Sequence, residues 1–236
     1  MQTDGGYKEY AGRLTELATQ VLADVPWKRL RRYRLVREAT VTGACGQYQP
    51  VPFPGITVLA TPYPLANRQV LACQTMVCRT SKGFAPVPAE TLHMTFADLL
   101  AGRSYGDLPR ERRIEVTRRA AELIRAWHPP GRASVPIIGI GAFPGVAVAI
   151  VRLPPEWYEA VVHLRQHLYG DRLLRASFVC QGFPLLTHIT LGYVESDWKS
   201  IAACLTALRN GSALGMTEVD GASVFRFPHM SRFDAA

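Results

Sequence analysis

The same short pattern occurs twice in this 236-residue chain, once in each half. The first copy is His93-Met94-Thr95-Phe96 and the second is His188-Ile189-Thr190-Leu191, so each has His, one apolar residue, Thr and a second apolar residue. Side chains alternate between the two faces of a strand, so His and Thr share one face and the apolar residues share the other. Each copy therefore predicts a strand with one polar and one packed face.

Similar elements surround the two copies. A pair of strands is expected before each copy, the copy itself lies on a strand, and a helix follows. The expected strand pairs are 56–60 with 70–77 and 135–142 with 146–153, the strands with the pattern are 92–97 and 185–194, and the helices that follow are 109–127 and 196–209. Further helices are expected near 7–21 and 155–169, and a last strand at 222–227. This order predicts an α+β fold with a weak internal repeat.

Two histidines that face one site can divide acid and base work between them. One neutral imidazole accepts a proton from water, and a protonated one gives a proton to a departing oxygen. The hydroxyls of Thr95 and Thr190 can donate to the free oxygens of a phosphate held between the histidines. This chemistry requires no metal. A single pattern of this kind would instead be typical of a structural histidine at a strand end.

The two patterns resemble the motifs of the two-histidine (2H) phosphoesterase superfamily, which includes bacterial RNA ligase/cyclic phosphodiesterase-like enzymes and cyclic nucleotide phosphodiesterases. Members have two HxT or HxS motifs about 80 to 100 residues apart, and here the separation is 188 − 93 = 95. The resemblance covers about 34–233. It implies a bilobal fold of two antiparallel sheets flanked by helices, with pseudo-two-fold symmetry around a central cleft. It also implies that His93, Thr95, His188 and Thr190 are catalytic, without a metal or other cofactor.

The resemblance predicts a hydrolase, a phosphodiesterase that opens a 2′,3′-cyclic phosphate, a cyclic nucleotide or a 2′–5′ linkage of a nucleotide or RNA end. Tyr193 stands where many relatives carry Arg, and Tyr193 or Phe225 is expected to stack on a base of the substrate. The alternative is an RNA- or nucleotide-binding module with little catalysis, which would use the basic segment 27–37 and the Arg-rich helix 109–127. The sequence does not assign acid and base.

Composition indicates a folded, globular protein. A net charge of +8 with 48% hydrophobic and 19% charged residues excludes a disordered chain. Residues 1–33 are expected to form an N-terminal helix and basic segment, followed by one bilobal domain over 34–236. No membrane-spanning or secretory segment is expected, so the protein is expected in the cytoplasm, and no obligatory protein partner is evident.

Glu159, His163 and His167 lie at four-residue steps on the helix expected at 155–169. They could form a metal site on one face of this helix, which is a weaker hypothesis than the two-histidine site.

Overall fold

The computed structural model describes most of the chain in ten segments. These are residues 3–19, 39–42, 47–50, 53–65, 67–80, 84–143, 146–175, 185–194, 214–229 and 232–236. The basic segment 27–37 and the expected helix 196–209 lie outside the described residues. The two strands β1 (Ala39–Thr42) and β2 (Gln47–Pro50) pair with each other, and the other described strands form two larger sheets.

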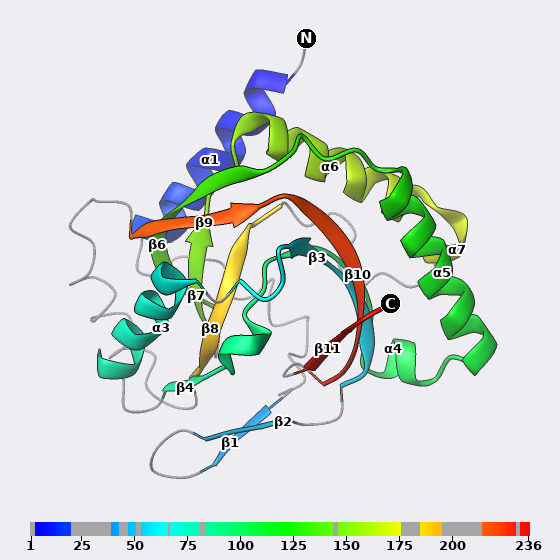
Figure 1. Ribbon diagram of the computed structural model, residues 1–236, viewed down its shortest axis with the longest axis horizontal. Helices are drawn as coiled ribbons and strands as arrows, with labels where there is room; N and C mark the ends of the chain where they lie inside the picture. The colour runs from blue at the N-terminus through cyan, green and yellow to red at the C-terminus, as the bar shows by residue number, and fades with distance from the viewer. Residues whose placement is uncertain are drawn as a thin grey trace.

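The first large sheet has four antiparallel strands in the order β11-β10-β3-β5. Its strands are β3 (Gly55–Thr61), β5 (Thr95–Ala101), β10 (Gly221–His229) and β11 (Arg232–Ala235). One face packs against helices α5 (Arg110–Ala126) and α6 (Pro155–Gly170), while the short helices α4 (Arg103–Gly106) and α7 (Arg172–Arg175) lie beside them (Figure 1). On the opposite face, Leu59 packs with Phe225, Phe227 and Phe233 in a group separate from the main core.

The second large sheet has five antiparallel strands in the order β4-β8-β7-β6-β9. Its strands are β4 (Phe84–Pro86), β6 (Ala133–Phe143), β7 (Val146–Val151), β8 (His188–Val194) and β9 (Gly215–Val219). Helix α3 (Arg68–Thr80) packs against it, and the buried amide of Gln74 in this helix donates to the carbonyls of Val87 and Leu191. A short 3-10 helix, η1 (Ala89–Thr91), leads into the first motif.

The predicted fold class is confirmed, since the two large sheets are antiparallel and are flanked by helices. The halves also share an element order, because β3, α3 and β5 are followed in the second half by β7, α6 and β8. The strand expected at 70–77 is wrong: this segment is helix α3. Val70, Cys73 and Val77 are buried at helical spacing on one face of it, and that period outweighs the strand preference of valine.

Helix α1 (Thr3–Thr19) packs on β6, β7 and α6. The hydroxyl of Tyr10 in this helix contacts the side-chain hydroxyl of Thr187, which directly precedes His188. Successive side chains along an extended chain point to opposite faces, so Thr187 faces away from His188 and in the same direction as the buried Ile189. Helix α1 therefore lies behind the second motif, on the face of the sheet opposite His188.

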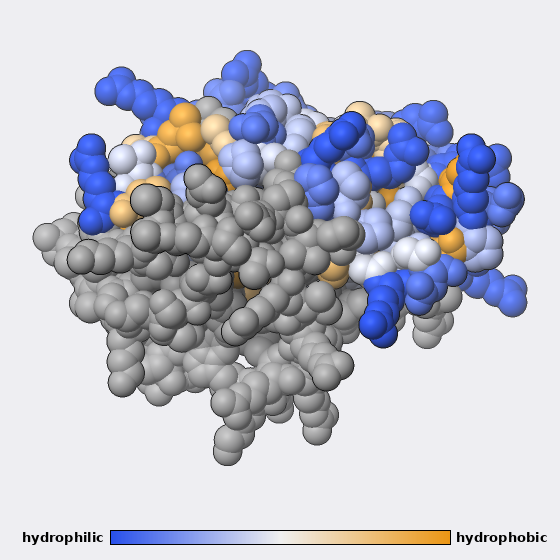
Figure 2. Space-filling view, turned by 90° about the horizontal axis from the view of Figure 1, so that it is seen from below, coloured by the Kyte–Doolittle hydropathy of each residue, from blue (hydrophilic) through white to orange (hydrophobic). Residues whose placement is uncertain are grey.

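The surface of the described residues is mainly hydrophilic, with small apolar patches, on the face shown in Figure 2. Ile114 and Met216 are the large apolar residues that are most exposed among those described. Within the same segments, no helix combines the length and apolar character needed to span a bilayer.

The close approach of α1 to β6 predicts that Gly139→Ala destabilises the protein. A Cβ atom at Gly139 would lie 2.7 Å from the Cβ of Ala18, so the added methyl group has no room, and overpacking of this kind costs about 1–3 kcal/mol of unfolding free energy. Gly12→Ala within α1 is the control, because nothing lies within 4 Å of its Cβ position, and it should stabilise the helix by about 0.5–1 kcal/mol. Chemical denaturation measures both, and equal stability of the two variants would contradict this placement of α1.

Candidate active site

The two motifs meet where the two large sheets touch. Met94 and Ile189 form an isolated antiparallel bridge, and both side chains are fully buried. Neighbours of a bridged pair point to the opposite face, so His93, Thr95, His188 and Thr190 share the other face. In this register His93 is opposite Thr190, and Thr95 is opposite His188. We call the face of both sheets that carries these four residues the histidine face.

Register also places the two imidazoles near each other. His93 and His188 are diagonal neighbours across the bridge, for which the usual Cα separation is about 7–8 Å. Their charges interact, because a proton on His188 lowers the pKa of His93. The structure thus brings together the four residues that the sequence predicted to be catalytic.

Both imidazoles are held by the same kind of hydrogen bond. Nδ1 of His93 lies 2.7 Å from the carbonyl oxygen of Thr91, and Nδ1 of His188 lies 2.9 Å from that of Leu186. A carbonyl oxygen only accepts, so Nδ1 carries the proton and donates in each case. In its neutral form each ring therefore presents Nε2 as the basic atom.

Burial favours the neutral form of both rings. Desolvation lowers the pKa of His93 to about 4, with a smaller opposing effect from the Thr91 carbonyl. Desolvation also lowers the pKa of His188, while the Leu186 carbonyl and the carboxylate of Asp98 act in the opposite direction. His188 is thus the ring with an anionic neighbour.

Asp98 is a site residue that the sequence analysis missed. Asp98 pairs with Thr57 of β3, and Thr95 pairs with Leu59 of the same strand. Thr57 and Leu59 are two residues apart and so point to the same face. Asp98 therefore lies on the histidine face with Thr95. Surrounding protein raises the pKa of its carboxyl, while His188 and Arg165 lower it. Asp98 itself is exposed to solvent. The period-two pattern of the motif does not indicate this residue, because Asp98 lies three residues after Thr95 and shares its face only through the irregular register of β5 with β3.

Aromatic rings line the histidine face of the four-stranded sheet. The ring of Phe233 packs on His93 with centroids 4.4 Å apart. Tyr63 contacts Phe225 and Phe233 at 4.8 and 6.0 Å, and Phe227 lies 5.3 Å from Phe233. The rings form an apolar group that continues from His93 across the sheet, in which the three phenylalanines are buried and Tyr63 is partly buried. We call Tyr63, Phe225, Phe227 and Phe233 the aromatic cluster.

The two residues expected to contact a base lie in different sheets. Phe225 pairs with Thr57 and so belongs to the histidine face of the four-stranded sheet. In the five-stranded sheet, Tyr193 pairs with Val146 of β7, and Thr190 pairs with Val148 of the same strand. Val146 and Val148 point to the same face, so Tyr193 lies on the same face as Thr190. The structure therefore places both on the histidine face, with only Phe225 in the aromatic cluster.

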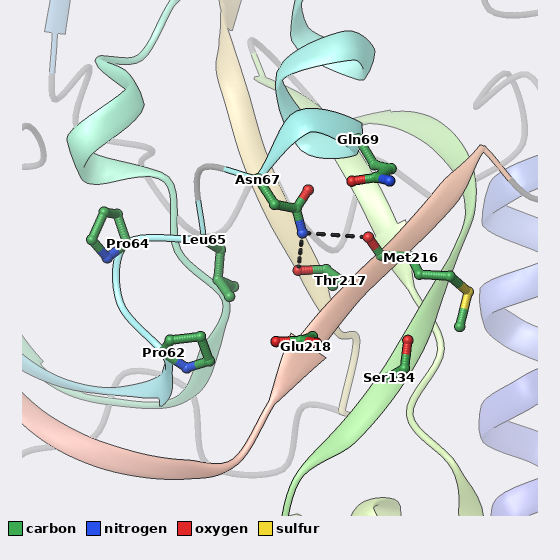
Figure 3. A pocket seen from close by; sticks show the side chains of 9 residues that line it. All are labelled: Pro62, Pro64, Leu65, Asn67, Gln69, Ser134, Met216, Thr217 and Glu218. Carbon is green, nitrogen blue, oxygen red and sulfur yellow. Dashed lines mark hydrogen bonds between the residues drawn. The ribbon is translucent and has the colours of Figure 1, made fainter.

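A hollow of about 390 Å³ lies between the segment that follows β3 and the strands β6 and β9 (Figure 3). Here the Asn67 amide donates to the Met216 carbonyl and to the Thr217 hydroxyl. Its lining includes one charged residue, Glu218, which forms an ion pair with Arg132. The hollow contains none of the motif residues, and its donor set does not suggest a reaction.

The other sequence candidates are not assembled into sites. His163 and His167 touch through their Nε2 atoms at 3.0 Å and are exposed, but the described residues include no cluster of three or more potential metal ligands, so the set with Glu159 is not supported.

Several arginines of α5 are paired with carboxylates. Arg112 pairs with Glu115, and Arg119 pairs with Glu122 and Asp171. These partners reduce the charge that this helix would offer to nucleic acid.

Comparisons with known proteins find solved structures of similar fold. No family model matches the chain, and no curated protein matches it. Among solved structures, the chain is similar to a conserved protein of unknown function, ATU0111 from Agrobacterium tumefaciens, with 17% identity over 94% of this chain and 96% of that one and a TM-score of 0.55. It is also similar to TT0787 of Thermus thermophilus (19%, 72% and 87%, TM-score 0.49) and to apo LigT of E. coli (12%, 79% and 96%, TM-score 0.46). Only the first of these three likenesses scores above 0.5, and it shows a shared fold.

The lowered pKa of His93 predicts a stability that depends on pH. The unfolded chain binds a proton at this residue below about pH 6.5, whereas the folded protein does so only near pH 4. The free energy of unfolding should therefore decrease as the pH falls from 6.5 to 4, by up to about 3 kcal/mol from this group. Denaturation at several pH values should show a smaller loss for His93→Gln and an unchanged one for the exposed His128→Gln. Equal pH dependence in all three proteins would rule out a buried neutral His93.

Proposed function

We propose that the protein is a metal-independent phosphodiesterase that hydrolyses a cyclic or 2′–5′ phosphodiester of a nucleotide or RNA end. The observation that carries the proposal is the bridge between Met94 and Ile189, which directs two His/Thr pairs to one face. The carbonyl contacts of Thr91 and Leu186 support it, because they orient the two rings in the same way. A structural histidine would not require this duplicated arrangement.

The local electrostatics suggest how the two rings divide the work. His93 is the proposed base, since burial keeps it neutral near pH 7 and its Nε2 can accept a proton from water. His188 is the proposed acid, since the nearby Asp98 carboxylate opposes the lowering of its pKa by burial and so favours its protonated form relative to that of His93. The water oxygen then bonds to phosphorus, the bond from phosphorus to the bridging ribose oxygen breaks, and His188 protonates that oxygen.

The threonines and the aromatic cluster have separate proposed roles. Thr95 and Thr190 donate hydrogen bonds to the non-bridging oxygens of the phosphate, which carry the charge that develops during attack. The aromatic cluster extends from His93, so we place the base of the nucleotide on its rings, with Phe225 and Tyr63 as the contacts. Tyr193 is the corresponding proposed contact on the five-stranded sheet.

The experiment that tests this function is hydrolysis of 2′,3′-cyclic mononucleotides, 3′,5′-cyclic mononucleotides and short 2′–5′ linked oligonucleotides by the purified protein. His93→Asn and His188→Asn should each lower kcat by a factor of about 10²–10⁴, since each removes a proton-transfer group. His128→Gln is the matched control, being an exposed histidine outside the motifs. Wild-type activity must also persist in EDTA. Full activity of either motif variant, or loss of activity with EDTA, would refute the mechanism.

The aromatic cluster predicts a contribution to binding that depends on the base. Stacking of one base on an aromatic ring contributes about 1–3 kcal/mol, so Phe225→Leu and Tyr63→Leu should raise KM for a cyclic mononucleotide about tenfold. Ribose 2′,3′-cyclic phosphate lacks the base and is the control substrate, for which KM should stay unchanged. An equal rise in KM for both substrates would show that the rings only support the fold.

A further inference from the structure

A buried chain of hydrogen bonds connects helix α1 to the second motif. The hydroxyl groups of Tyr10 and Thr187 lie 2.6 Å apart, and the backbone N–H of Leu153 donates to the Tyr10 hydroxyl at 3.0 Å. The Thr187 hydroxyl donates to the carbonyl oxygen of Val151. Tyr10 is 3% exposed and Thr187 is fully buried, so water does not compete for these bonds.

The direction of the chain is fixed by counting protons. Thr187 has one hydroxyl proton, and the Val151 carbonyl takes it. The Tyr10 hydroxyl must therefore donate to Thr187 and accept from Leu153. Burial raises the pKa of Tyr10 to about 12, so its proton is present throughout the neutral range. Each hydroxyl in the chain accepts one bond and donates one.

The chain ends on the backbone that carries His188. Thr187 directly precedes His188, and its carbonyl oxygen accepts from the N–H of Val151. The residue before it, Leu186, provides the carbonyl that holds Nδ1 of His188. Tyr10 thus fixes the residue that lies between His188 and the carbonyl that orients its ring.

We propose that Tyr10 is a positioning residue for His188, and that helix α1 thereby supports the active site from behind although it lies outside the segment with the family resemblance. The inference rests on the proposed function for its effect on turnover, but the orientation of His188 can be measured independently. Without the Tyr10 hydroxyl, the Leu153 N–H and the Thr187 hydroxyl each lose a buried partner, which the surrounding backbone can relieve only by moving.

The experiment compares Tyr10→Phe with Tyr7→Phe in the full chain. Tyr7 is the matched control because it lies on the same helix, and its hydroxyl donates to the Leu153 carbonyl at 3.1 Å without contacting Thr187. Thr187→Val and Thr187→Ser complete the set, since valine keeps the shape without the hydroxyl and serine keeps the hydroxyl. The readouts are kcat and KM on the best cyclic substrate, and the His188 ring signals in a nitrogen-15 NMR pH titration.

We expect Tyr10→Phe and Thr187→Val to lower kcat about tenfold with KM within about twofold, since small misplacement of a catalytic group has effects of this size or larger. Thr187→Ser and Tyr7→Phe should stay within about threefold of the wild-type kcat. The double variant Tyr10→Phe with Thr187→Val should be no worse than either single variant, because both interrupt the same chain. The NMR titration of His188 should shift in Tyr10→Phe and remain as in wild type in Tyr7→Phe.

The two readouts separate the two proposals. If the wild-type protein hydrolyses none of the substrates, the proposed function fails, and the NMR titration still decides whether Tyr10 positions His188. If Tyr10→Phe leaves both the titration and the kcat of a folded protein like those of Tyr7→Phe, the positioning role is overturned.

Discussion

The antiparallel bridge between Met94 and Ile189 is the contact on which the arrangement of the site depends. It is an isolated residue pair that joins the two motifs, and the buried side chains of both large sheets pack in one core around it. Because side chains alternate, burying these two apolar residues directs both histidines and both threonines outward together. A shift of register by one residue would bury the polar groups and expose the apolar ones. The packing that joins the two halves therefore also determines which face carries the histidines and threonines.

The two histidines have similar backbone geometry but different electrostatic surroundings. Each donates from Nδ1 to the carbonyl two residues earlier, so their ring orientations arise in the same way. The difference comes from the neighbours, since the aromatic ring of Phe233 lies on His93 and the carboxylate of Asp98 acts on His188. An apolar neighbour disfavours the charged ring and an anionic neighbour favours it. The proposed roles of base and acid follow from this asymmetry within a symmetric frame.

The fold class and the common face of the four motif residues could be predicted because both depend on local pattern. The period-two alternation in each motif is visible in the chain itself, as is the helix 109–127 that is observed as α5. The prediction of a strand at 70–77 failed because a short apolar run with Val70 and Val77 is compatible with the period of a strand and with that of a helix. Asp98 and Phe233 could not be predicted, because their places in the site depend on strand bulges and on the pairing of β11 with β10.

Helix α1 and the aromatic cluster lie on opposite sides of the proposed site, and this difference separates what each can do. Tyr10 reaches the side chain of Thr187, which points away from the histidine face, so α1 can act on a substrate only through the backbone that carries His188. The aromatic cluster lies on the histidine face itself, next to His93. Aromatic rings accept a base by stacking, so in the proposed function a substrate whose phosphate lies between the motifs has its nucleoside on the four-stranded sheet.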